Sequence, residues 1–475
     1  MDEDVAFLSA TEIATAVRER QLSPLEVVDR YLGRIERLNP RLNAYITVTA
    51  EHARTAAREL EKKLSRRKAT GPLLGVPVAV KDQFCTQGVR TTDGSFAYRD
   101  FIPRHDATVV QRLTDAGAIM LGKLAMSELA LGGTRRSAWG TTRNPWDTER
   151  TPGESSTGSG AALGAHLCAA SVGEDTGGSG RVPAAYCNAV GLRPTYGRVS
   201  RNGMMTACWF LDQAAPMTKT VADCALLLGV IAGRDELDMT TSRRRVPDYA
   251  ASLGDGIQGV RIGVIRELHE HPNVHPDVKA CVDRALQRFT ELGAHVREVS
   301  IPLMNIAGAL YIAIGDTEGA GAADDLLREH SSELDAASRT RLLAAALVPF
   351  KLYNRAMKAR VQLRRQFINA LECVDVLACA TSPYPPPRHA DLTAPFQDGD
   401  DVRSRFFFRR AYTGSYALAA LPAISVPCGF TSRRLPVGLQ LGGKPFAEEM
   451  LLRVAAAYER AEPWHLQRAP EATIA

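Results

Sequence analysis

The stretch that most constrains this chain runs from residue 151 to residue 195. Two loops of small residues, Gly153–Gly160 and Asp175–Gly180, flank an apolar run of Ala, Leu and Cys. Such loops bring the backbone close to a neighbour and leave N–H groups free to point at it. The run between them, Ala161–Ala170, is small enough for a helix packed tightly in a core. One compact unit therefore presents hydroxyls and backbone donors together, which acyl-transfer chemistry needs.

Length and composition favour a globular chain with a sizeable core. The chain has 475 residues, of which 45% are hydrophobic, and a formal net charge of +5, which does not indicate nucleic-acid binding. No apolar stretch reaches the roughly eighteen residues of a membrane span, and the acidic N-terminus lacks the apolar segment of a signal peptide. Nine cysteines without a C-x-x-C motif predict reduced thiols. We therefore expect a cytoplasmic protein.

Alternating strand and helix patterns predict an α/β fold. Residues 1–65 are expected to be helical, with Ser9 and Ser23 as helix caps. Nothing between residues 66 and 460 is typical of an inter-domain linker. Further on, a largely helical region is expected at 303–372, helices at 221–232, 276–292 and 446–460, and strands at 76–80, 118–121, 261–265, 295–299, 374–379, 423–426 and 437–441.

A serine nucleophile in the two small-residue loops would need a base other than histidine. The chain has no G-x-S-x-G, S-x-x-K or H-E-x-x-H motif, and none of its ten histidines lies in these loops. A neutral lysine can act as the base. Lys81, which ends the apolar run 76–80, is the candidate, and a surface lysine beside Asp82 is the alternative interpretation. No clustered metal ligands are present, so we expect no metal.

Several motifs, in order, resemble those of the amidase signature family. GVPVAVKD at 75–82, PGESSTGSGAA at 152–162 and DTGGSGRVPAAYCNAVGLRPTYGRVS at 175–200 resemble its lysine, Gly/Ser and nucleophile motifs. The resemblance implies a single large α/β domain, a mixed twisted sheet covered by helices on both faces, and no cofactor. It places this domain at 66–465, with its signature core at 71–230 and the helical segment 1–65 packed against it.

The resemblance also implies a Ser-cisSer-Lys triad. Ser179 would be the nucleophile, Ser155 would bridge it to Lys81, and the Glu154–Ser155 peptide would be cis. Its oxyanion hole would be backbone N–H groups, here those of Thr176, Gly177, Gly178 and Ser179.

Other interpretations of these residues stay open. Ser155 could simply cap the following helix, and Ser156 is expected to be structural. Arg181 is expected to pair with Asp175 and to shape the turn. Glu154 and Thr157 stand where the family motif has glycines, so they could narrow or polarise the loop.

One branch of the family, the A subunit of the tRNA-dependent glutamyl/aspartyl amidotransferase, looks most similar, notably at YGRVSRNGM. That branch usually carries an acidic residue for the glutamine ammonium where this chain has Arg410, which is unfavourable on Coulomb grounds. Phe406–Phe408 indicate an apolar acyl pocket or, equally, a core helix. We therefore expect a stand-alone hydrolase of amides, and of carbamates (urethanes) or aryl esters by the same route.

Two alternatives remain: an amidotransferase subunit with B and C partners and tRNA, and a non-catalytic scaffold. For the stand-alone enzyme we expect a small amide or carbamate substrate, a monomer or homodimer, and no nucleic-acid or membrane partner. Large side chains near the motifs are further pocket candidates: Met126, Leu129, Met205, Trp209 and Phe210.

Overall fold

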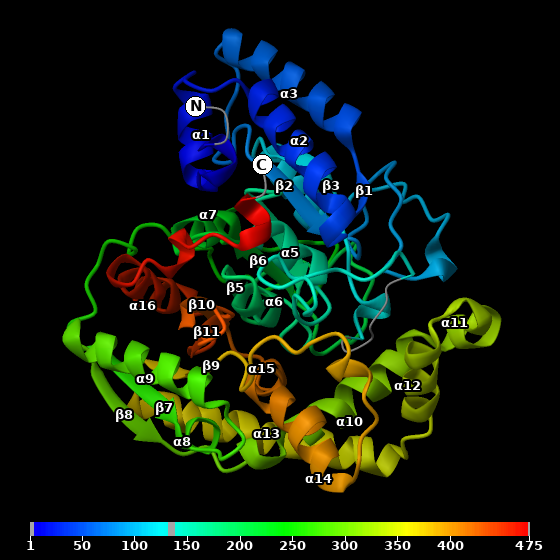
Figure 1. The fold of residues 1–475 in the computed structure, drawn as a ribbon, viewed down its shortest axis with the longest axis vertical. Coiled ribbons are helices and arrows are strands. Elements are labelled where there is room, and N and C mark those ends of the chain that lie inside the picture. The colour runs from blue at the N-terminus through cyan, green and yellow to red at the C-terminus, as the bar shows by residue number, and fades with distance from the viewer. Residues whose placement is uncertain (1–3, 132–137, 474–475) are drawn as a thin grey trace.

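The computed structural model describes residues 4–131 and 138–473, and its centre is one eleven-stranded sheet (Figure 1). The strand order is β1-β3-β2-β4-β6-β5-β10-β11-β9-β7-β8, with parallel and antiparallel pairs mixed. The strands are β1 (Tyr45–Val48), β2 (Pro77–Lys81), β3 (Ile119–Leu124), β4 (Ala170–Glu174), β5 (Val190–Arg193), β6 (Ala214–Thr218), β7 (Arg261–Ile265), β8 (His295–Val299), β9 (Val376–Ala380), β10 (Ala423–Phe430) and β11 (Pro436–Gly442).

Helices surround this sheet, as Figure 1 shows. α7, α9 and α16 pack against one another or against the strands, and α5 and α6 form a second layer on the central strands. The helices are α1 (Ala10–Arg18), α2 (Pro24–Leu42), α3 (Ala50–Ser65), α4 (Thr108–Asp115), α5 (Thr157–Gly164), α6 (Arg181–Tyr186), α7 (Val221–Ile231), α8 (Arg266–His269), α9 (Pro276–Glu291), α10 (Met304–Ala322), α11 (Asp324–Glu329), α12 (Ala336–Ala346), α13 (Phe350–Cys373), α14 (Gly399–Asp401), α15 (Arg409–Leu418) and α16 (Glu448–Ala461).

The predicted class, a single large α/β domain with a mixed sheet, is confirmed. The first two helices begin as expected: Ser9 and Glu12 form a capping box, and Ser23 caps α2 with Pro24 at its first position. All nine cysteines are free thiols, and only Cys373 is exposed. No helix in the described ranges has the length and apolar character needed to cross a membrane.

Four strands were not expected. β1 lies within the segment predicted to be wholly helical, and it joins the sheet beside β3. The run Ala161–Ala170 is not one helix, because α5 ends at Gly164 and β4 begins at Ala170. β4, β5 and β6 read ASVGE, VGLR and AAPMT, which have little intrinsic strand preference. They become strands because the neighbouring strands on both sides pair with them.

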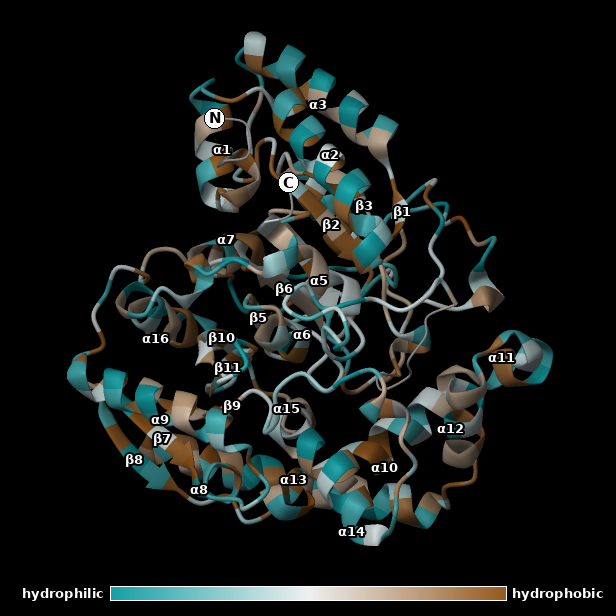
Figure 2. Cartoon of the chain, viewed as in Figure 1, coloured by the Kyte–Doolittle hydropathy of each residue, from teal (hydrophilic) through white to brown (hydrophobic). Residues whose placement is uncertain are grey.

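Strands in the centre of the molecule are more hydrophobic than the helices at its surface (Figure 2). The central strands are apolar and β2, β4, β5, β6, β9 and β11 are buried along their whole length. Outer helices such as α2 and α9 have one apolar and one polar side, and their apolar residues are the buried ones. The C-terminal segment returns to α2, where Arg34 donates a hydrogen bond to the Ala472 carbonyl at 3.0 Å.

Candidate active site

The parallel strands β2 and β4 end side by side, and their last residues meet. Carboxyl ends of adjacent parallel strands lie at the same edge of a sheet. Lys81 ends β2 and Glu174 ends β4, and Lys81 Nζ lies 2.7 Å from Glu174 Oε2. Neither side chain has any exposed surface, so the two form a buried ion pair.

The two candidate serines lie in the loops just before α5 and α6. Lys81 Nζ donates a hydrogen bond to Ser155 Oγ at 2.7 Å, and the Ser155 N–H donates to Ser179 Oγ at 3.4 Å. Ser155 is fully buried, while Ser179 is 6% exposed and faces a cavity. The fold thus brings together three side chains that are 74 and 24 positions apart in the sequence.

The expected cis peptide is absent from the described part of the chain, so the Glu154–Ser155 bond is trans. This corrects the expectation from the family resemblance. The trans form is the lower-energy state for a non-proline residue. In this form the Ser155 hydroxyl reaches Lys81 and the Ser155 N–H faces Ser179.

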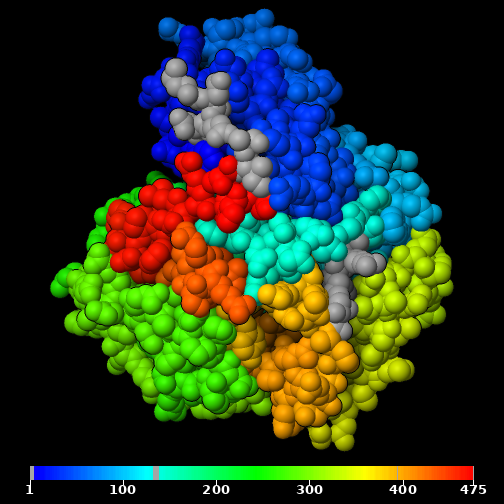
Figure 3. Space-filling view, in the orientation of Figure 1, coloured from blue at the N-terminus to red at the C-terminus, as the bar shows by residue number. Residues whose placement is uncertain are grey.

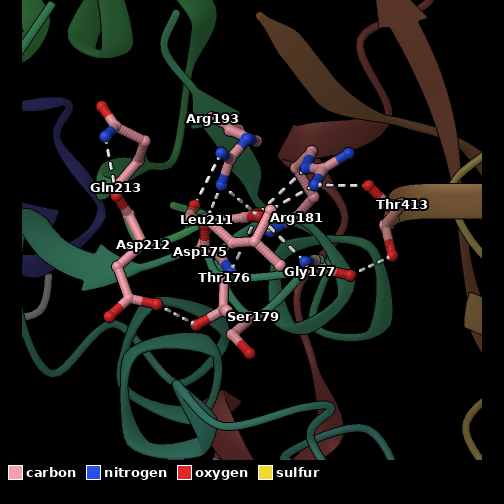
Figure 4. A network of polar contacts seen from close by, with 12 residues as sticks. Asp175, Thr176, Gly177, Ser179, Arg181, Arg193, Leu211, Asp212, Gln213 and Thr413 are labelled. Carbon is pink, nitrogen blue, oxygen red and sulfur yellow. Dashed lines mark hydrogen bonds and ion pairs between the residues drawn. The ribbon is translucent and has the colours of Figure 1, made fainter. Parts of the chain in front are cut away.

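The turn that carries Ser179 is built around the Asp175 carboxylate (Figure 4). Asp175 accepts hydrogen bonds from the Gly178 N–H at 2.8 Å and from the Arg181 side chain at 2.8 and 2.9 Å, and Arg193 lies at 3.4 Å. Burial by itself would raise the pKa of Asp175, but Arg181, Arg193 and the Gly178 N–H hold it well below its usual value. The expected Arg181–Asp175 pair is present and shapes the turn.

The turn has unoccupied backbone donors, and two of its residues, Gly177 and Ser179, line the small space beside the nucleophile candidate. In the described part of the chain, the N–H groups of Thr176, Gly177 and Ser179 make no hydrogen bond, whereas the Gly178 N–H is occupied by Asp175. Gly178 has φ +125°, and a Cβ there would overlap Thr413 Oγ1. Thr413 Oγ1 in turn donates to the Gly177 carbonyl at 2.6 Å (Figure 4). Three of the four expected oxyanion donors are therefore available.

Two buried acidic side chains, Glu174 and Asp212, are linked through the Thr176 hydroxyl. The Thr176 hydroxyl contacts both Glu174 and Asp212, the latter at 2.8 Å. Burial, together with the charge of Glu174, raises the pKa of Asp212 to about 7. Ser156 is structural, as expected, because its Oγ donates to the Glu174 carbonyl at 3.1 Å and accepts from the Glu174 N–H at 3.2 Å.

Two spaces that share three lining residues lie near Ser179, and Ser179 lines the smaller one. A small one of about 20 Å³ touches Ser179, and a large cavity of about 1250 Å³ leads outward. Arg341, Arg409 and Arg410 line both. The space-filling view is hollowed where the green and orange parts of the chain meet (Figure 3).

Of the six pocket candidates taken from the sequence, only Arg410 lines these spaces. Trp209 is 57% exposed, and Met205 pairs its backbone with Gln83. Met126 is buried and Leu129 belongs to a separate apolar cluster with α10 and α12 residues. Phe210 lies near Glu318 and Arg360. Proximity to a motif along the chain does not place these side chains at Ser179.

Sequence reasoning missed several residues of the site. Glu174 directly precedes the DTGGS motif, and that position was the signal that could have revealed it. Arg341 and Tyr311 line the small space from helices more than 130 residues further along the chain. No local pattern marks them.

Of Phe406–Phe408, expected to form an apolar acyl pocket or a core helix, Phe406 lines the large cavity. The three residues lie in a π-helical turn, Val402–Phe408, before α15. Phe406 lies against the Arg410 guanidinium, 4.0 Å from ring centre to carbon, and Phe408 packs on His271 and Tyr412. Phe407 and Phe408 line neither of the two spaces near Ser179.

The sheet, the buried Lys81–Ser155 contact and the glycine turn define the class as an amidase-type hydrolase. A family model described as Amidase matches residues 26–452, and the chain belongs to this family, whose fold is the amidase signature fold.

Relatives of two kinds are similar over nearly the whole chain. The A subunit of glutamyl-tRNA(Gln) amidotransferase from Geobacter metallireducens is 38% identical and covers 97% of this chain and 99% of its own. The structure of the corresponding protein from Thermotoga maritima is 33% identical with a TM-score of 0.84, covering 100% of both chains. The structure of 6-aminohexanoate cyclic dimer hydrolase complexed with substrate is 28% identical with a TM-score of 0.87, covering 98% of this chain and 100% of its own.

Proposed function

We propose that this protein hydrolyses amide C–N bonds through an acyl-enzyme on Ser179. The observation that carries this proposal is the buried 2.7 Å contact between Lys81 Nζ and Ser155 Oγ, directly beside Ser179. The lysine thereby contacts the Ser155 hydroxyl, the Ser155 backbone N–H donates to Ser179 Oγ, and unoccupied N–H groups of the same turn lie close to Ser179.

The reaction begins at the Ser179 hydroxyl. Ser179 Oγ attacks the amide carbonyl carbon while its proton passes to Ser155 Oγ, and the Ser155 proton passes to Lys81 Nζ. The negative oxygen is stabilised by the N–H groups of Thr176, Gly177 and Ser179. The C–N bond then breaks, and the leaving nitrogen takes the proton back through Ser155. Water hydrolyses the Ser179 ester by the same relay and releases the acid.

The type of base predicts the pH dependence. A lysine can accept a proton only as a neutral amine, so turnover is expected to increase with pH toward a neutral-to-alkaline optimum. Carbamates and aryl esters would react by the same steps, since only the groups on the carbonyl carbon differ.

A second candidate is the glutamine-hydrolysing component of an amidotransferase. The names and near-complete coverage of the curated relatives favour it, and it would use the same Ser179 chemistry with partner subunits. The buried Arg410 beside Ser179 favours the stand-alone enzyme, because a guanidinium repels the ammonium of glutamine. Such an enzyme would act as a monomer or homodimer on a small amide or carbamate.

The test is amine release by the purified chain alone. Glutamine, a small aliphatic amide, an aryl anilide and an aryl carbamate are compared, with Ser179→Ala and Lys81→Ala as variants. Turnover that falls at least about 1000-fold in both variants supports the stand-alone hydrolase. Glutamine hydrolysis that requires partner subunits would assign the protein to the amidotransferases. A serine-reactive phosphonate that fails to label Ser179 would favour a non-catalytic scaffold.

A further inference from the structure

The guanidinium groups of three arginines line the route to Ser179. Arg341 comes from α12, and Arg409 and Arg410 open α15. All three line both the small space at Ser179 and the large outer cavity, so a substrate reaching Ser179 through that cavity contacts them.

Two of these arginines already have a carboxylate partner. Arg341 Nη2 lies 2.6 Å from Asp316, and Arg409 Nη2 lies 3.0 Å from Glu154. The Glu154 side chain that replaces a glycine of the family motif is thus a counter-ion in the pocket wall. Burial by itself would raise the pKa of Glu154, but Arg409 and Arg410 lower it, so it stays ionised.

Arg410 is different, because it makes no ion pair within the described ranges. Its Nη1 donates to the Phe406 carbonyl at 2.9 Å, and its guanidinium carbon lies 4.0 Å from the Phe406 ring centre. Arg410 is only 6% exposed. Three cations and two carboxylates leave one uncompensated positive charge beside Ser179.

The uncompensated charge of Arg410 destabilises the folded protein while no ligand is bound. Burial, together with the neighbouring Arg409, lowers the pKa of Arg410 to about 10. An isolated buried charge is unfavourable until a counter-charge with good geometry joins it. A carboxylate suits the planar fork of a guanidinium, which can bind both of its oxygens.

We propose that the substrate is an amide whose acyl part carries a carboxylate, and that Arg410 binds this carboxylate while Ser179 attacks the amide carbonyl. The inference rests on the amide hydrolysis proposed above and specifies its substrate class. The space that Ser179 lines is much smaller than the outer cavity, which favours a short acyl chain. Mono-amides of short dicarboxylic acids, without an ammonium group, have this chemistry.

The test compares two amides of similar length that differ in charge. Succinamate carries a carboxylate where pentanamide carries a methyl-terminated chain, and glutamine has one more chain carbon and an ammonium. We expect kcat/KM for succinamate to exceed that for pentanamide and for glutamine by about 100-fold, a ratio typical of a buried charge pair. In Arg410→Gln this ratio should fall to within a few-fold of one.

Arg365→Gln is the matched control, since Arg365 is exposed on α13 and its loss removes the same charge from the surface. The ratio should be unchanged in this variant. Equal kcat/KM values for succinamate and pentanamide would overturn the inference but leave amide hydrolysis intact. So would a succinamate preference that survives Arg410→Gln.

A binding measurement separates this inference from the catalytic proposal. Succinate is titrated calorimetrically into the wild-type chain and into Arg410→Gln. Binding that weakens at least about tenfold in the variant supports the carboxylate site even if no amide is hydrolysed. Equal affinities overturn the site, whatever the catalytic activity.

Discussion

At the scale of single residues, Glu174 holds Lys81, the proposed base, in a buried ion pair. It places a carboxylate 2.7 Å from Lys81 Nζ in a region without solvent, and it also contacts the Thr176 hydroxyl. Glu174 therefore fixes the position of Lys81 Nζ beside Ser155 Oγ.

The substitution Glu174→Gln removes this counter-charge and keeps the shape. We expect kcat/KM to fall at least about tenfold, because Glu174 holds Lys81 Nζ beside Ser155 Oγ and also contacts the Thr176 hydroxyl. Glu128→Gln is the control, since Glu128 is a buried carboxyl that binds Ser95 and not Lys81. Unchanged kcat/KM in Glu174→Gln would show that this contact does not position Lys81.

At the scale of elements, the turn between β4 and α6 sets the geometry of the site. Gly178 has φ +125° and approaches Thr413 of α15 too closely for a Cβ. We expect Gly178→Ala to reduce kcat at least about 100-fold, because the turn must shift and its N–H groups no longer point at the reacting oxygen. Circular dichroism should show an intact fold.

A matched glycine lies on the surface of α2. Gly33 is exposed and a Cβ there meets nothing within 4 Å. Gly33→Ala should keep full activity and raise the free energy of unfolding by about 0.5–1 kcal/mol, because alanine is the better helix former. Full activity in Gly178→Ala would contradict the role given to the turn.

At the scale of the whole molecule, stability depends on buried carboxyl groups that join distant helices. Glu459 of α16 accepts hydrogen bonds from the Val221 N–H at the start of α7, at 3.0 and 3.1 Å. Burial raises the pKa of Glu459 to about 8, with Asp223 adding to the shift, Arg460 opposing it and His465 lying 3.8 Å away. The folded state therefore holds a proton here that the unfolded chain, with a pKa of about 4.3, releases earlier.

The raised pKa of Glu459 makes the free energy of unfolding decrease as the pH rises. The stabilisation from Glu459 is complete below about pH 4 and is lost as the pH rises toward about 8. In Glu459→Gln the group stays neutral, so urea unfolding should show a smaller decline in stability across this window. Glu449→Gln, an exposed change on the same helix, serves as the control. An unchanged pH dependence in Glu459→Gln would contradict the buried, protonated carboxyl.

The sequence by itself determined the α/β class and most strands of the second half, and it indicated Lys81 as a candidate base, because apolar runs and their ends are patterns visible along the chain. The candidates Ser155 and Ser179 come from the resemblance of their glycine- and serine-rich loops to family motifs. β4, β5 and β6 escaped prediction, because their strand conformation comes from pairing with neighbours and not from their own residues.

Only the tertiary structure decided what surrounds these residues. The pairing of Lys81 with Glu174 requires β2 and β4 to be parallel neighbours, and the arginine cluster requires α12 and α15 to meet beside the turn. Arg341 lies 162 positions after Ser179, so no sequence window contains both. Charge balance in a cavity depends on distances in space. The unpaired charge of Arg410 is therefore visible only in the structure, where Asp316 and Glu154 are paired with the neighbouring Arg341 and Arg409.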